Sequence, residues 1–414
     1  MKINENSFLL KKHILIRFVK HKKNNLNNKL EYKFLILAFI IFCLSIPFIF
    51  LFYSKVNTVK QIEAFNITQF FNTTIRSNSI LIFEKNDFHY ECTPGFAKYF
   101  LDLGFNVDII MIKMGKETFI FFEPTKKLRF FILDDSKYYK SEEYIVKFRD
   151  IFNKYLAILV QTMTPDVKTF YSNANLLKGK NSIFVYHYYP EMPLIDFHNN
   201  NRSWTLLNFT NLALEVNPHY FGKIKFRDKN KITRFFIVST GYRNYDQLIS
   251  ASDKLKNENL QFEIIVTGRN QALSEKIIPD NIKDKFLFRL HLSYFHLMNL
   301  IKNIDFIIIT LTRTNRGDNT YINGRSTGSA QLAYGFLKPC IINKDFTKTY
   351  RMNNENSIIY SDLKDSLYFS MRNEIIMTNK EYKKKQYNLK KTADEIYEIS
   401  KNNVKTTINY ILKS

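Results

Sequence analysis

The sequence predicts an α/β protein: two domains that face each other across a cleft, each a parallel sheet covered by helices, preceded by one N-terminal transmembrane helix. Three observations predict this class. A run of twenty residues near the N-terminus carries no charge. In the rest of the chain, apolar β-rich runs alternate with helical patterns, as is typical of parallel sheets. About 340 residues follow the apolar run and a short stem, a length that suits two domains better than one core.

The uncharged run from Phe34 to Tyr53 matches the roughly 20 helical residues that cross the hydrocarbon core of a membrane. Pro47 lies inside it, and membrane helices tolerate proline better than soluble ones do. A cleaved signal peptide is the alternative. It is disfavoured because 33 residues precede the run and no small-residue cleavage site follows it. We therefore expect a cytosolic tail at 1–33, a transmembrane helix at 34–53 and a stem at 54–78.

Charge sets the expected orientation of this anchor. Nine Lys or Arg residues and only two Glu precede the run, whereas Lys55 and Lys60 are the only basic residues between it and Arg76. The positive-inside rule then leaves the N-terminus in the cytosol and sends the rest across, which is a type II topology. N-glycosylation sequons agree with this orientation because all of them follow the run, at Asn66, Asn72, Asn201 and Asn208.

The chain carries a net charge of +23 at pH 7, which raises the question of nucleic-acid binding. The lysines are spread along the chain between asparagines and form no recognition motif, so a solvated basic surface is favoured and no nucleic-acid partner is expected. Such a surface would attract anionic diphosphate donors or membrane headgroups.

Cysteine is scarce, which indicates that the core and not cross-links stabilises the fold. Cys43 lies in the apolar run, and Cys92 and Cys340 fall in different predicted domains. A disulfide between the last two is compatible with the sequence but not implied by it.

The first domain is expected at 79–225. Its strands are predicted at the apolar runs Ser79–Glu84, Val107–Lys113, Thr118–Phe122, Leu128–Leu133, Leu156–Gln161 and Ser182–Tyr186. Its helices are predicted at Thr93–Leu103 and Glu142–Tyr155.

The second domain is expected at 226–386, after a polar, Lys-rich linker. Its strands are predicted at Arg234–Ser239, Phe262–Thr267, Phe286–Leu290, Asp305–Thr310, Cys340–Asn343 and Ser357–Tyr360. Its helices are predicted at Asp246–Lys256, Tyr294–Asn303, Ser329–Phe336 and Leu363–Arg372. A long amphipathic helix at Tyr387–Leu412 lies in a final segment, 387–414.

Ligands of open α/β sheets bind beyond the carboxyl ends of the strands, so the loops after strands are the places to search. The segment after the Asp305–Thr310 strand leads into a helix whose start is rich in small and hydroxyl residues. The free N–H groups and dipole of such a start favour an anion such as a diphosphate, although an ordinary N-cap is the alternative. The candidates there are Arg325, Ser326, Thr327, Gly328 and Ser329.

Two further junctions of the same domain carry glycine or arginine at this edge. Gly241 and Arg243 follow one strand, and Gly268 and Arg269 follow the next. Arginine offers a forked donor that matches phosphate geometry. Three co-located junctions of this kind predict a site for an anionic ligand.

The loop after Ser79–Glu84 in the first domain holds three polar groups within five residues, namely Asp87, His89 and Glu91. Carboxylates and imidazoles act as general bases, so these side chains are the candidate catalytic residues. A structural or merely exposed histidine is the alternative interpretation.

The second half of the chain contains four motifs in this order: FEIIVTGR, LSYFHLMNLIKNIDFIII, STGSAQLAYGFLKPCII and NSIIY. This order resembles the donor-binding, C-terminal domain of GT-B-fold glycosyltransferases, most like the retaining family 4 group. The segment ILIFEKNDFHYECTPGFAKYFLDLGFNVDII resembles the first βα unit of these enzymes. The resemblance covers about residues 79–412. It implies two Rossmann-like domains, a nucleotide-sugar as co-substrate with no other cofactor, and a final helix that packs back on the N-terminal domain.

The resemblance also implies residue roles. Arg243 stands where a basic residue contacts the diphosphate, Gly268 and Arg269 stand at the turn after the second strand, and His291 lies where the nucleotide base is held. The family's two glutamates would fall near Gly324 and Leu332. Neither is acidic here, and Gln331 is the nearest substitute.

Metal-dependent GT-A glycosyltransferases need an Asp-x-Asp motif, which this sequence lacks; Asp134-Asp135 comes nearest and reads as a solvated turn. We therefore expect no metal site and a metal-independent glycosyltransferase. Its acceptor would be a glycan, glycoprotein or glycolipid. With a type II anchor, the enzyme is expected in the Golgi or alternatively in the endoplasmic reticulum. The alternatives are a GT-A enzyme, a catalytically inactive lumenal protein of the same fold, and a lipid-binding scaffold.

Overall fold

The computed structural model describes residues 64–86, 89–133, 142–162, 179, 181–187, 200–208, 213–238, 243, 245–268, 273 and 277–414. All of these belong to the larger of two units of the chain, Val59–Ser414. No helix among the described residues is long and apolar enough to cross a membrane. The transmembrane helix expected at 34–53 and the tail at 1–33 lie outside the described residues.

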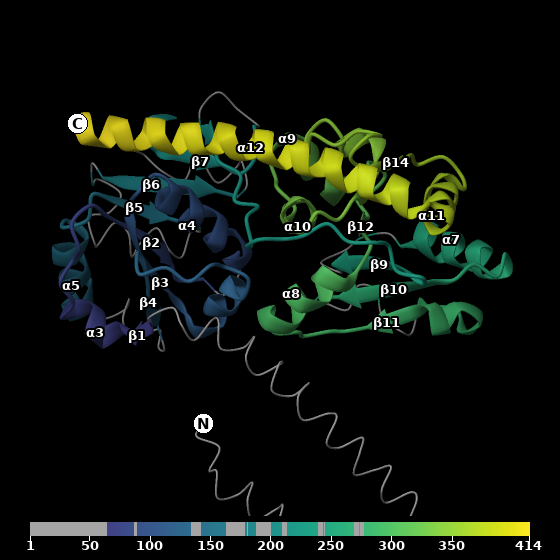
Figure 1. Ribbon diagram of the computed structural model, residues 1–414, viewed down its shortest axis with the longest axis horizontal. Coiled ribbons are helices and arrows are strands. Elements are labelled where there is room, and N and C mark those ends of the chain that lie inside the picture. The colour runs from purple at the N-terminus through teal and green to yellow at the C-terminus, as the bar shows by residue number, and fades with distance from the viewer. Residues whose placement is uncertain are drawn as a thin grey trace, which may run out of the picture. The chain divides into compact units, whose positions relative to one another are not determined.

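The first sheet has eight parallel strands in the order β1-β4-β3-β2-β5-β6-β7-β8 (Figure 1). The strands are β1 (Ala64–Asn66), β2 (Ser79–Glu84), β3 (Asn106–Ile112), β4 (Leu128–Leu133), β5 (Ala157–Val160), β6 (Ser182–Tyr186), β7 (Ser203–Thr205) and β8 (Leu214–Glu215). The helices are α3 (Ile67–Phe71), α4 (Thr93–Asp102) and α5 (Glu142–Phe152). All six residues of β2 are buried, with Ile80 and Leu81 in cores on opposite faces, as alternating side chains require.

The second sheet has six parallel strands in the order β11-β10-β9-β12-β13-β14. The strands are β9 (Thr233–Val238), β10 (Phe262–Thr267), β11 (Phe286–Phe288), β12 (Phe306–Ile309), β13 (Cys340–Asn343) and β14 (Ile358–Tyr360). The helices are α7 (Asp246–Asn257), α8 (Tyr294–Asn303), α9 (Thr320–Asn323), α10 (Gly328–Phe336) and α11 (Ser366–Ile376). Two α/β domains with parallel sheets, as the sequence predicts, are therefore confirmed.

Two segments differ from the prediction. The strand expected at Thr118–Phe122 is wrong: the 3₁₀ helix η2 (Lys113–Phe119) covers its first two residues, and Phe121 forms only an isolated bridge, to Gly222. Four of the five residues of this run are apolar, so periodicity cannot distinguish a strand from a compact turn here. Within the stretch expected to be a stem, α3 begins with a capping box at Asn66, and β1 joins the edge of the first sheet beside β4.

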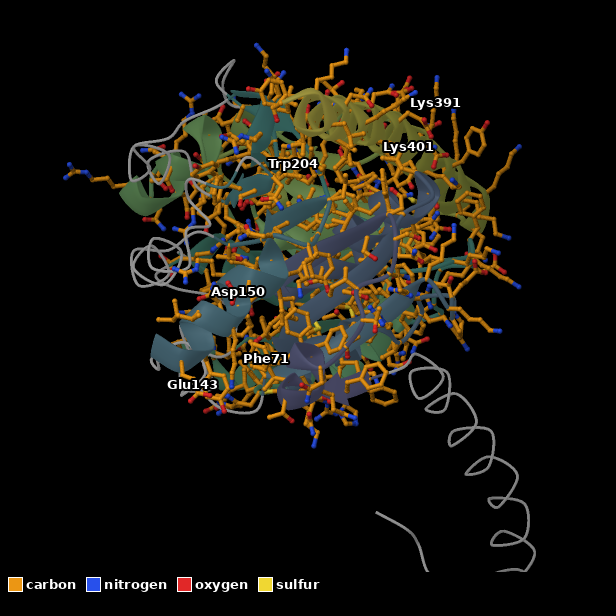
Figure 2. The ribbon with its side chains drawn as sticks, turned by 90° about the vertical axis from the view of Figure 1, so that its left-hand side faces the viewer. Phe71, Glu143, Asp150, Trp204, Lys391 and Lys401 are labelled. Atoms are coloured by element: carbon orange, nitrogen blue, oxygen red, sulfur yellow. The ribbon has the colours of Figure 1, made fainter. Side chains whose placement is uncertain are left out.

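The last helix, α12 (Asn379–Lys413), is 35 residues long and runs along both domains (Figure 1). Leu389 and Ile396 pack in the core of the second domain, and Val404 and Ile408 pack in the core of the first. On its far half, Thr407 Oγ1 accepts a hydrogen bond of 2.9 Å from the indole of Trp204. Figure 2 labels Trp204 together with Lys391 and Lys401 of this helix.

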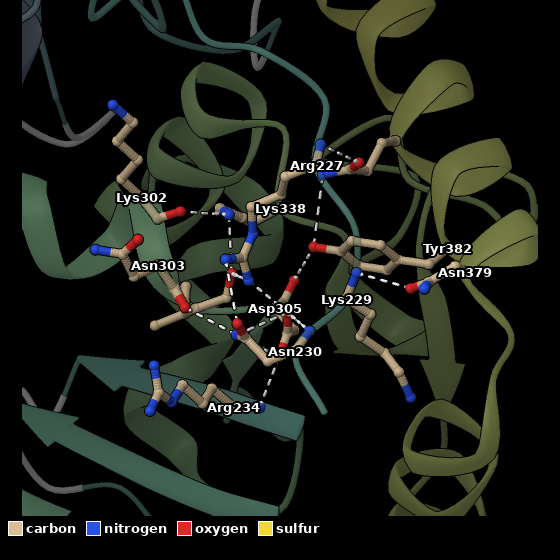
Figure 3. Close-up of polar contacts among 12 residues, drawn as sticks. Arg227, Lys229, Asn230, Arg234, Lys302, Asn303, Asp305, Lys338, Asn379 and Tyr382 are labelled. Carbon is tan, nitrogen blue, oxygen red and sulfur yellow. Dashed lines mark hydrogen bonds and ion pairs between the residues drawn. The ribbon is translucent and has the colours of Figure 1, made fainter. Parts of the chain in front are cut away.

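Asp305, whose side chain is completely buried, hydrogen-bonds the linker between the domains to the second sheet (Figure 3). Its carboxylate accepts hydrogen bonds from the Arg227 guanidinium, from Asn230 N at 3.0 Å and from Arg234 N at 2.8 Å. Tyr382 of α12 donates to the backbone carbonyl of Asp305 at 3.0 Å. The linker and α12 thus share one buried polar anchor.

Cys92 and Cys340 are buried and free. Burial raises the pKa of both thiols, and the nearby carboxyls of Glu91 and Glu84 raise that of Cys92 further. The structure therefore contains no disulfide between these two cysteines.

Candidate functional site

The topology places a switch point in each sheet. In the first sheet β2 and β5 are neighbours, and the connections that leave them run to opposite sides of the sheet. In the second sheet β9 and β12 have the same relation. Ligands of open α/β sheets bind beyond the strand ends at such points, so both pairs mark where the site is expected.

At the first switch point the last residue of β2, Glu84, is completely buried. Burial raises the pKa of its carboxyl to about 7, although hydrogen bonds from Thr162 and Asn86 act in the opposite direction. Asn86 donates its backbone N–H at 2.7 Å, and Thr162, just after β5, donates its hydroxyl. The pKa of Glu84 therefore lies close to neutral pH. No pattern in the sequence had pointed to this residue.

His89 lies in the loop after β2 with a left-handed backbone, at φ 65°. Its carbonyl accepts a hydrogen bond of 2.8 Å from Gln161 at the end of β5. Its Nδ1 is 3.5 Å from Oε1 of Glu91. The loop thus brings together two of the three predicted catalytic side chains; the third, Asp87, lies outside the described residues.

His187, directly after β6, stacks on His89 with the ring centroids 4.0 Å apart. Its Nε2 is 3.0 Å from the carbonyl oxygen of Gln161, so Nε2 carries the hydrogen and Nδ1 is an acceptor. Burial, and then the charge of His89, lowers the pKa of His187 well below its ordinary value, so the ring is neutral at pH 7. Nδ1 is buried and has no partner within the described part of the chain. The rule that singled out strand-end loops would also have found this residue.

Glu91 reaches the second domain. Its Oε2 accepts a hydrogen bond of 3.5 Å from the Tyr294 hydroxyl, and a Cβ atom added to Gly328 would lie 3.4 Å from its Oε1. Burial raises the pKa of Glu91, but the hydrogen bond and charge of His89, a backbone hydrogen bond and Tyr294 lower it more, so it lies below its ordinary value. The negative charge beside the start of α10 is therefore the side chain of Glu91.

The segment before α10 takes the form of an N-cap that also contacts the first domain. Thr327 Oγ1 accepts from the N–H of Ser329 at 3.4 Å, as in an ordinary cap. The N–H of Ser326 donates to the carbonyl of His187 at 3.4 Å. The start of α10 therefore has the N-cap that was the alternative interpretation, and it lies close to the carboxylate of Glu91.

Arg243 and Arg325 come together at the second switch point. Their guanidinium carbons lie 5.4 Å and 5.1 Å from the centre of the Tyr321 ring, which is within cation–π range. Asp318 is buried nearby; burial raises the pKa of its carboxyl, and a hydrogen bond from Thr312 N and the charge of Arg243 partly offset that effect. Arg243 thus lies close to both the Tyr321 ring and the buried Asp318, and Arg325 lies close to the same ring.

The other predicted donor residues are more scattered. Gly268, at φ 145°, accepts a hydrogen bond of 3.3 Å from the N–H of the exposed His291. Gln331 is buried within α10, and its Oε1 has no partner among the described residues. At the positions where the resemblance implies glutamates, Gly324 is buried and Leu332 packs in the core of the second domain.

Some of the predicted residues cannot be placed. Gly241 and Arg269, and the pair Asp134-Asp135, lie outside the described residues. Within the described residues, no group of three or more His, Cys, Asp or Glu side chains is arranged to hold a metal ion.

No protein-family model matches this sequence, and no curated protein matches it either. Solved structures do match. The crystal structure of a glycosyltransferase from Rickettsia africae ESF-5 matches with a TM-score of 0.50 at 13% identity, covering 82% of this chain and all of that one (100%). HepE from Anabaena in complex with UDP and glucose has a TM-score of 0.47 at 12% identity, covering 79% of this chain and 98% of that chain. An alpha-glucosyltransferase in complex with UDP-glucose and DNA containing an abasic site has a TM-score of 0.47 at 10% identity, covering 78% and 94%.

At such low identity the Rickettsia match shows a common fold. Because it extends over both sheets of this chain and the whole of that protein, the two parallel-sheet domains have the arrangement of GT-B glycosyltransferases.

Proposed function

We propose that this chain is a glycosyltransferase that moves a sugar from a nucleotide-sugar donor to a glycan, glycoprotein or glycolipid, without a metal ion. The observation that carries the proposal is the convergence of Arg243 and Arg325 on Tyr321, at the switch point of the second sheet. The fold it shares with the Rickettsia glycosyltransferase supports the same class.

The donor diphosphate would lie between the two guanidiniums and the start of α10. Arginine pairs with phosphate oxygens through two parallel hydrogen bonds, and the first N–H groups of a helix add partial positive charge. Glu91 stands beside that helix start, so the incoming diphosphate displaces the carboxylate or shares the helix end with it. This competition would make the arginines decisive for donor affinity.

His89 is the group in the first domain best placed to handle the proton of the acceptor hydroxyl. The Glu91 carboxylate, 3.5 Å from Nδ1, would orient the ring and stabilise its protonated form. The neutral ring of His187 stacks on the His89 ring and covers one face of it. Asp87 shares the loop and stays a further candidate for the same task.

The proposal includes membership of the retaining family 4 group. It also includes donor contacts by Gly241, Gly268, Arg269 and His291. The packing of Leu332 in the core favours a rival: a protein that keeps the fold and binds donors but transfers nothing. Turnover separates the two functions, because the rival binds donor without releasing nucleotide.

We also propose that residues 34–53 anchor the enzyme in the membrane with its catalytic part on the lumenal side, in the Golgi. Protease treatment of sealed microsomes tests the orientation. A C-terminal tag on the full chain should be protected and an N-terminal tag should be removed. Removal of the C-terminal tag would overturn the topology but would leave the catalytic proposal intact.

The decisive experiment is a panel of UDP- and GDP-sugars titrated against the full-length chain in detergent, with nucleotide release measured in parallel. We expect Arg243→Ala and Arg325→Ala each to weaken the binding of the preferred donor by about tenfold or more, the effect of losing one charge-assisted contact. Arg313→Ala is the matched control, since this arginine pairs with Asp345 at 3.2 Å on the exposed surface.

Unchanged donor affinity in both variants would overturn the assignment of the diphosphate. Nucleotide release that persists in excess EDTA is expected. Loss of release that Mn²⁺ restores would favour the metal-dependent alternative.

A further inference from the structure

Two carboxylates of the first domain lie at the starts of two helices of the second. Oε1 of Glu91 is 3.4 Å from the position that a Cβ atom on Gly328, the first residue of α10, would take. Oε2 of Glu117 accepts a hydrogen bond of 3.1 Å from the N–H of Phe295, in the first turn of α8. Figure 1 shows both helices on the side of the second domain that faces the first. The start of a helix carries partial positive charge, so both contacts favour the approach of the domains.

The two helix starts differ in how they use the carboxylate. At α8 the carboxylate of Glu117 accepts a backbone N–H directly. At α10 the N–H of Gly328 donates a hydrogen bond to no group among the described residues. The nearby carboxylate of Glu91 instead accepts from the hydroxyl of Tyr294 at 3.5 Å. Glu91 thus contributes negative charge at the start of α10 but leaves its first donor free.

The space beside Gly328 is open apart from Glu91. Among the described residues, no atom other than Oε1 of Glu91 lies within 4 Å of the Cβ position of Gly328. Gly335 of the same helix is different, because a Cβ atom there would lie 2.2 Å from the ring of Phe221. Movement of the Glu91 carboxylate would therefore leave room for another anion beside a free N–H group.

A second partner for Glu91 lies within its own loop. Oε1, the oxygen beside Gly328, is also 3.5 Å from Nδ1 of His89. This distance is longer than the roughly 3 Å of a well-formed N–H···O hydrogen bond. The loop itself is held in place, since Gln161 donates to the carbonyl of His89 at 2.8 Å. A short movement of the carboxylate away from α10 and toward the imidazole would therefore strengthen the pair that it forms with His89.

We propose that Glu91 controls the transfer site. Without a donor its carboxylate occupies the place of a phosphate group beside the start of α10, and the donor diphosphate moves it onto His89. This role rests on the proposed function, because it assigns the regulation of that same site. The proposed base is then fully paired with its carboxylate only after the donor has bound, and the donor binds less tightly than it would to an uncharged residue.

The first test is calorimetric titration of the full-length chain in detergent with inorganic pyrophosphate, the charged group that UDP and GDP share. Glu91→Gln keeps the shape of the side chain and removes its charge. We expect its dissociation constant for pyrophosphate to be about fivefold or more below that of the wild type, because a like charge no longer competes. Unchanged or weaker binding in Glu91→Gln would overturn the proposal.

Glu117→Gln is the matched control, since it makes the same change at the start of α8, where the carboxylate is hydrogen-bonded to the helix. It should bind pyrophosphate as the wild type does. An equal gain of affinity in Glu117→Gln and Glu91→Gln would show that any loss of negative charge from the first domain suffices, and would also overturn the proposal.

The second test measures nucleotide release from the preferred sugar donor. We expect kcat of Glu91→Gln to fall about tenfold or more, because a neutral amide cannot stabilise the protonated ring of His89. Tighter binding and slower turnover in one variant cannot arise from misfolding, which would weaken both. An unchanged kcat would overturn the movement of the carboxylate onto His89.

Failure of this role and failure of the proposed function give different results. A wild type that binds pyrophosphate but releases nucleotide from no sugar donor would contradict transfer, and the affinities of the two glutamine variants would still decide whether Glu91 competes for the phosphate position. A wild type that binds no pyrophosphate would overturn both the role of Glu91 and the diphosphate site.

Discussion

The hydroxyl group of Thr162 donates a hydrogen bond to the carboxyl group of Glu84, which joins the end of β5 to the end of β2. Gln161 adds a second tie between the same places by donating to the carbonyl of His89 at 2.8 Å. Together these bonds hold the loop that carries His89 and Glu91 against the switch point of the first sheet. The geometry of the proposed catalytic pair therefore depends on a buried acid that does not itself face the donor site.

The ionisation of Glu84 should make stability depend on pH. The folded protein keeps this proton up to about pH 7, whereas an ordinary glutamate with a pKa of 4.5 has already lost it in the unfolded chain. The folded state thus binds more protons between these values, so the free energy of unfolding falls as the pH rises through this window, by about 3 kcal/mol in all. Glu84→Gln cannot ionise and should lose this component.

Urea unfolding at a series of pH values, followed by the fluorescence of Trp204, measures this component, since this is the only tryptophan of the chain. The stability of Glu84→Gln relative to the wild type should increase between about pH 4.5 and pH 7.5, and remain constant above that. A difference that is the same at every pH would show that the Glu84 carboxyl titrates normally.

Gly335, in the last turn of α10, should not tolerate a side chain. A Cβ atom there would lie 2.2 Å from the Phe221 ring and 2.4 Å from the carbonyl oxygen of His219. Alanine stabilises a helix relative to glycine by about 1 kcal/mol. A methyl group that clashes with a neighbouring ring and a backbone carbonyl costs about 1–3 kcal/mol. We expect Gly335→Ala to lower the free energy of unfolding. Gly317→Ala is the control, because its nearest atom is Asn315 Oδ1 at 3.6 Å.

The urea midpoints of both glycine variants, measured by circular dichroism, check this expectation. A midpoint for Gly335→Ala at or above that of Gly317→Ala would mean that α10 and the linker separate at little cost.

The far half of α12 should contribute strongly to the core of the first domain. Ile408 is 3% exposed in that core, so Ile408→Ala should cost about 2–5 kcal/mol of unfolding free energy. Ile399→Ala on the same helix, at a site 41% exposed, should cost less than about 0.5 kcal/mol. Trp204 fluorescence in urea reports both values. Equal effects of the two changes would mean that the helix end is not part of the first core.

Much of the fold could be predicted from the sequence because most parallel strands here are buried on both faces. Such strands read as continuous apolar runs, and β10 and β13 have the bounds that their runs predict. Helix α8 also begins where predicted, because Ser293 caps it by accepting from the N–H of His296. β1 could not be found in this way, since three residues at a sheet edge carry no periodic signal.

The candidate site could be predicted only in part. The rule of strand ends pointed to Arg243 and Arg325, but not to Tyr321, a residue of the short helix α9 whose ring lies close to both guanidiniums. The position of Glu91 beside Gly328 depends on the packing of segments more than 200 residues apart, for which no local pattern exists. The role of Glu84 could not be predicted, because an acidic residue at the end of a strand usually indicates a solvated turn.

The length of α12 has a consequence for synthesis. The ribosome completes the first sheet long before it makes residues 404–411, and those residues fill that sheet's core. The first domain therefore emerges first but reaches its final packing only when the C-terminus has left the exit tunnel. Until then apolar surface around Trp204 stays uncovered, and chaperones have their longest opportunity to bind there.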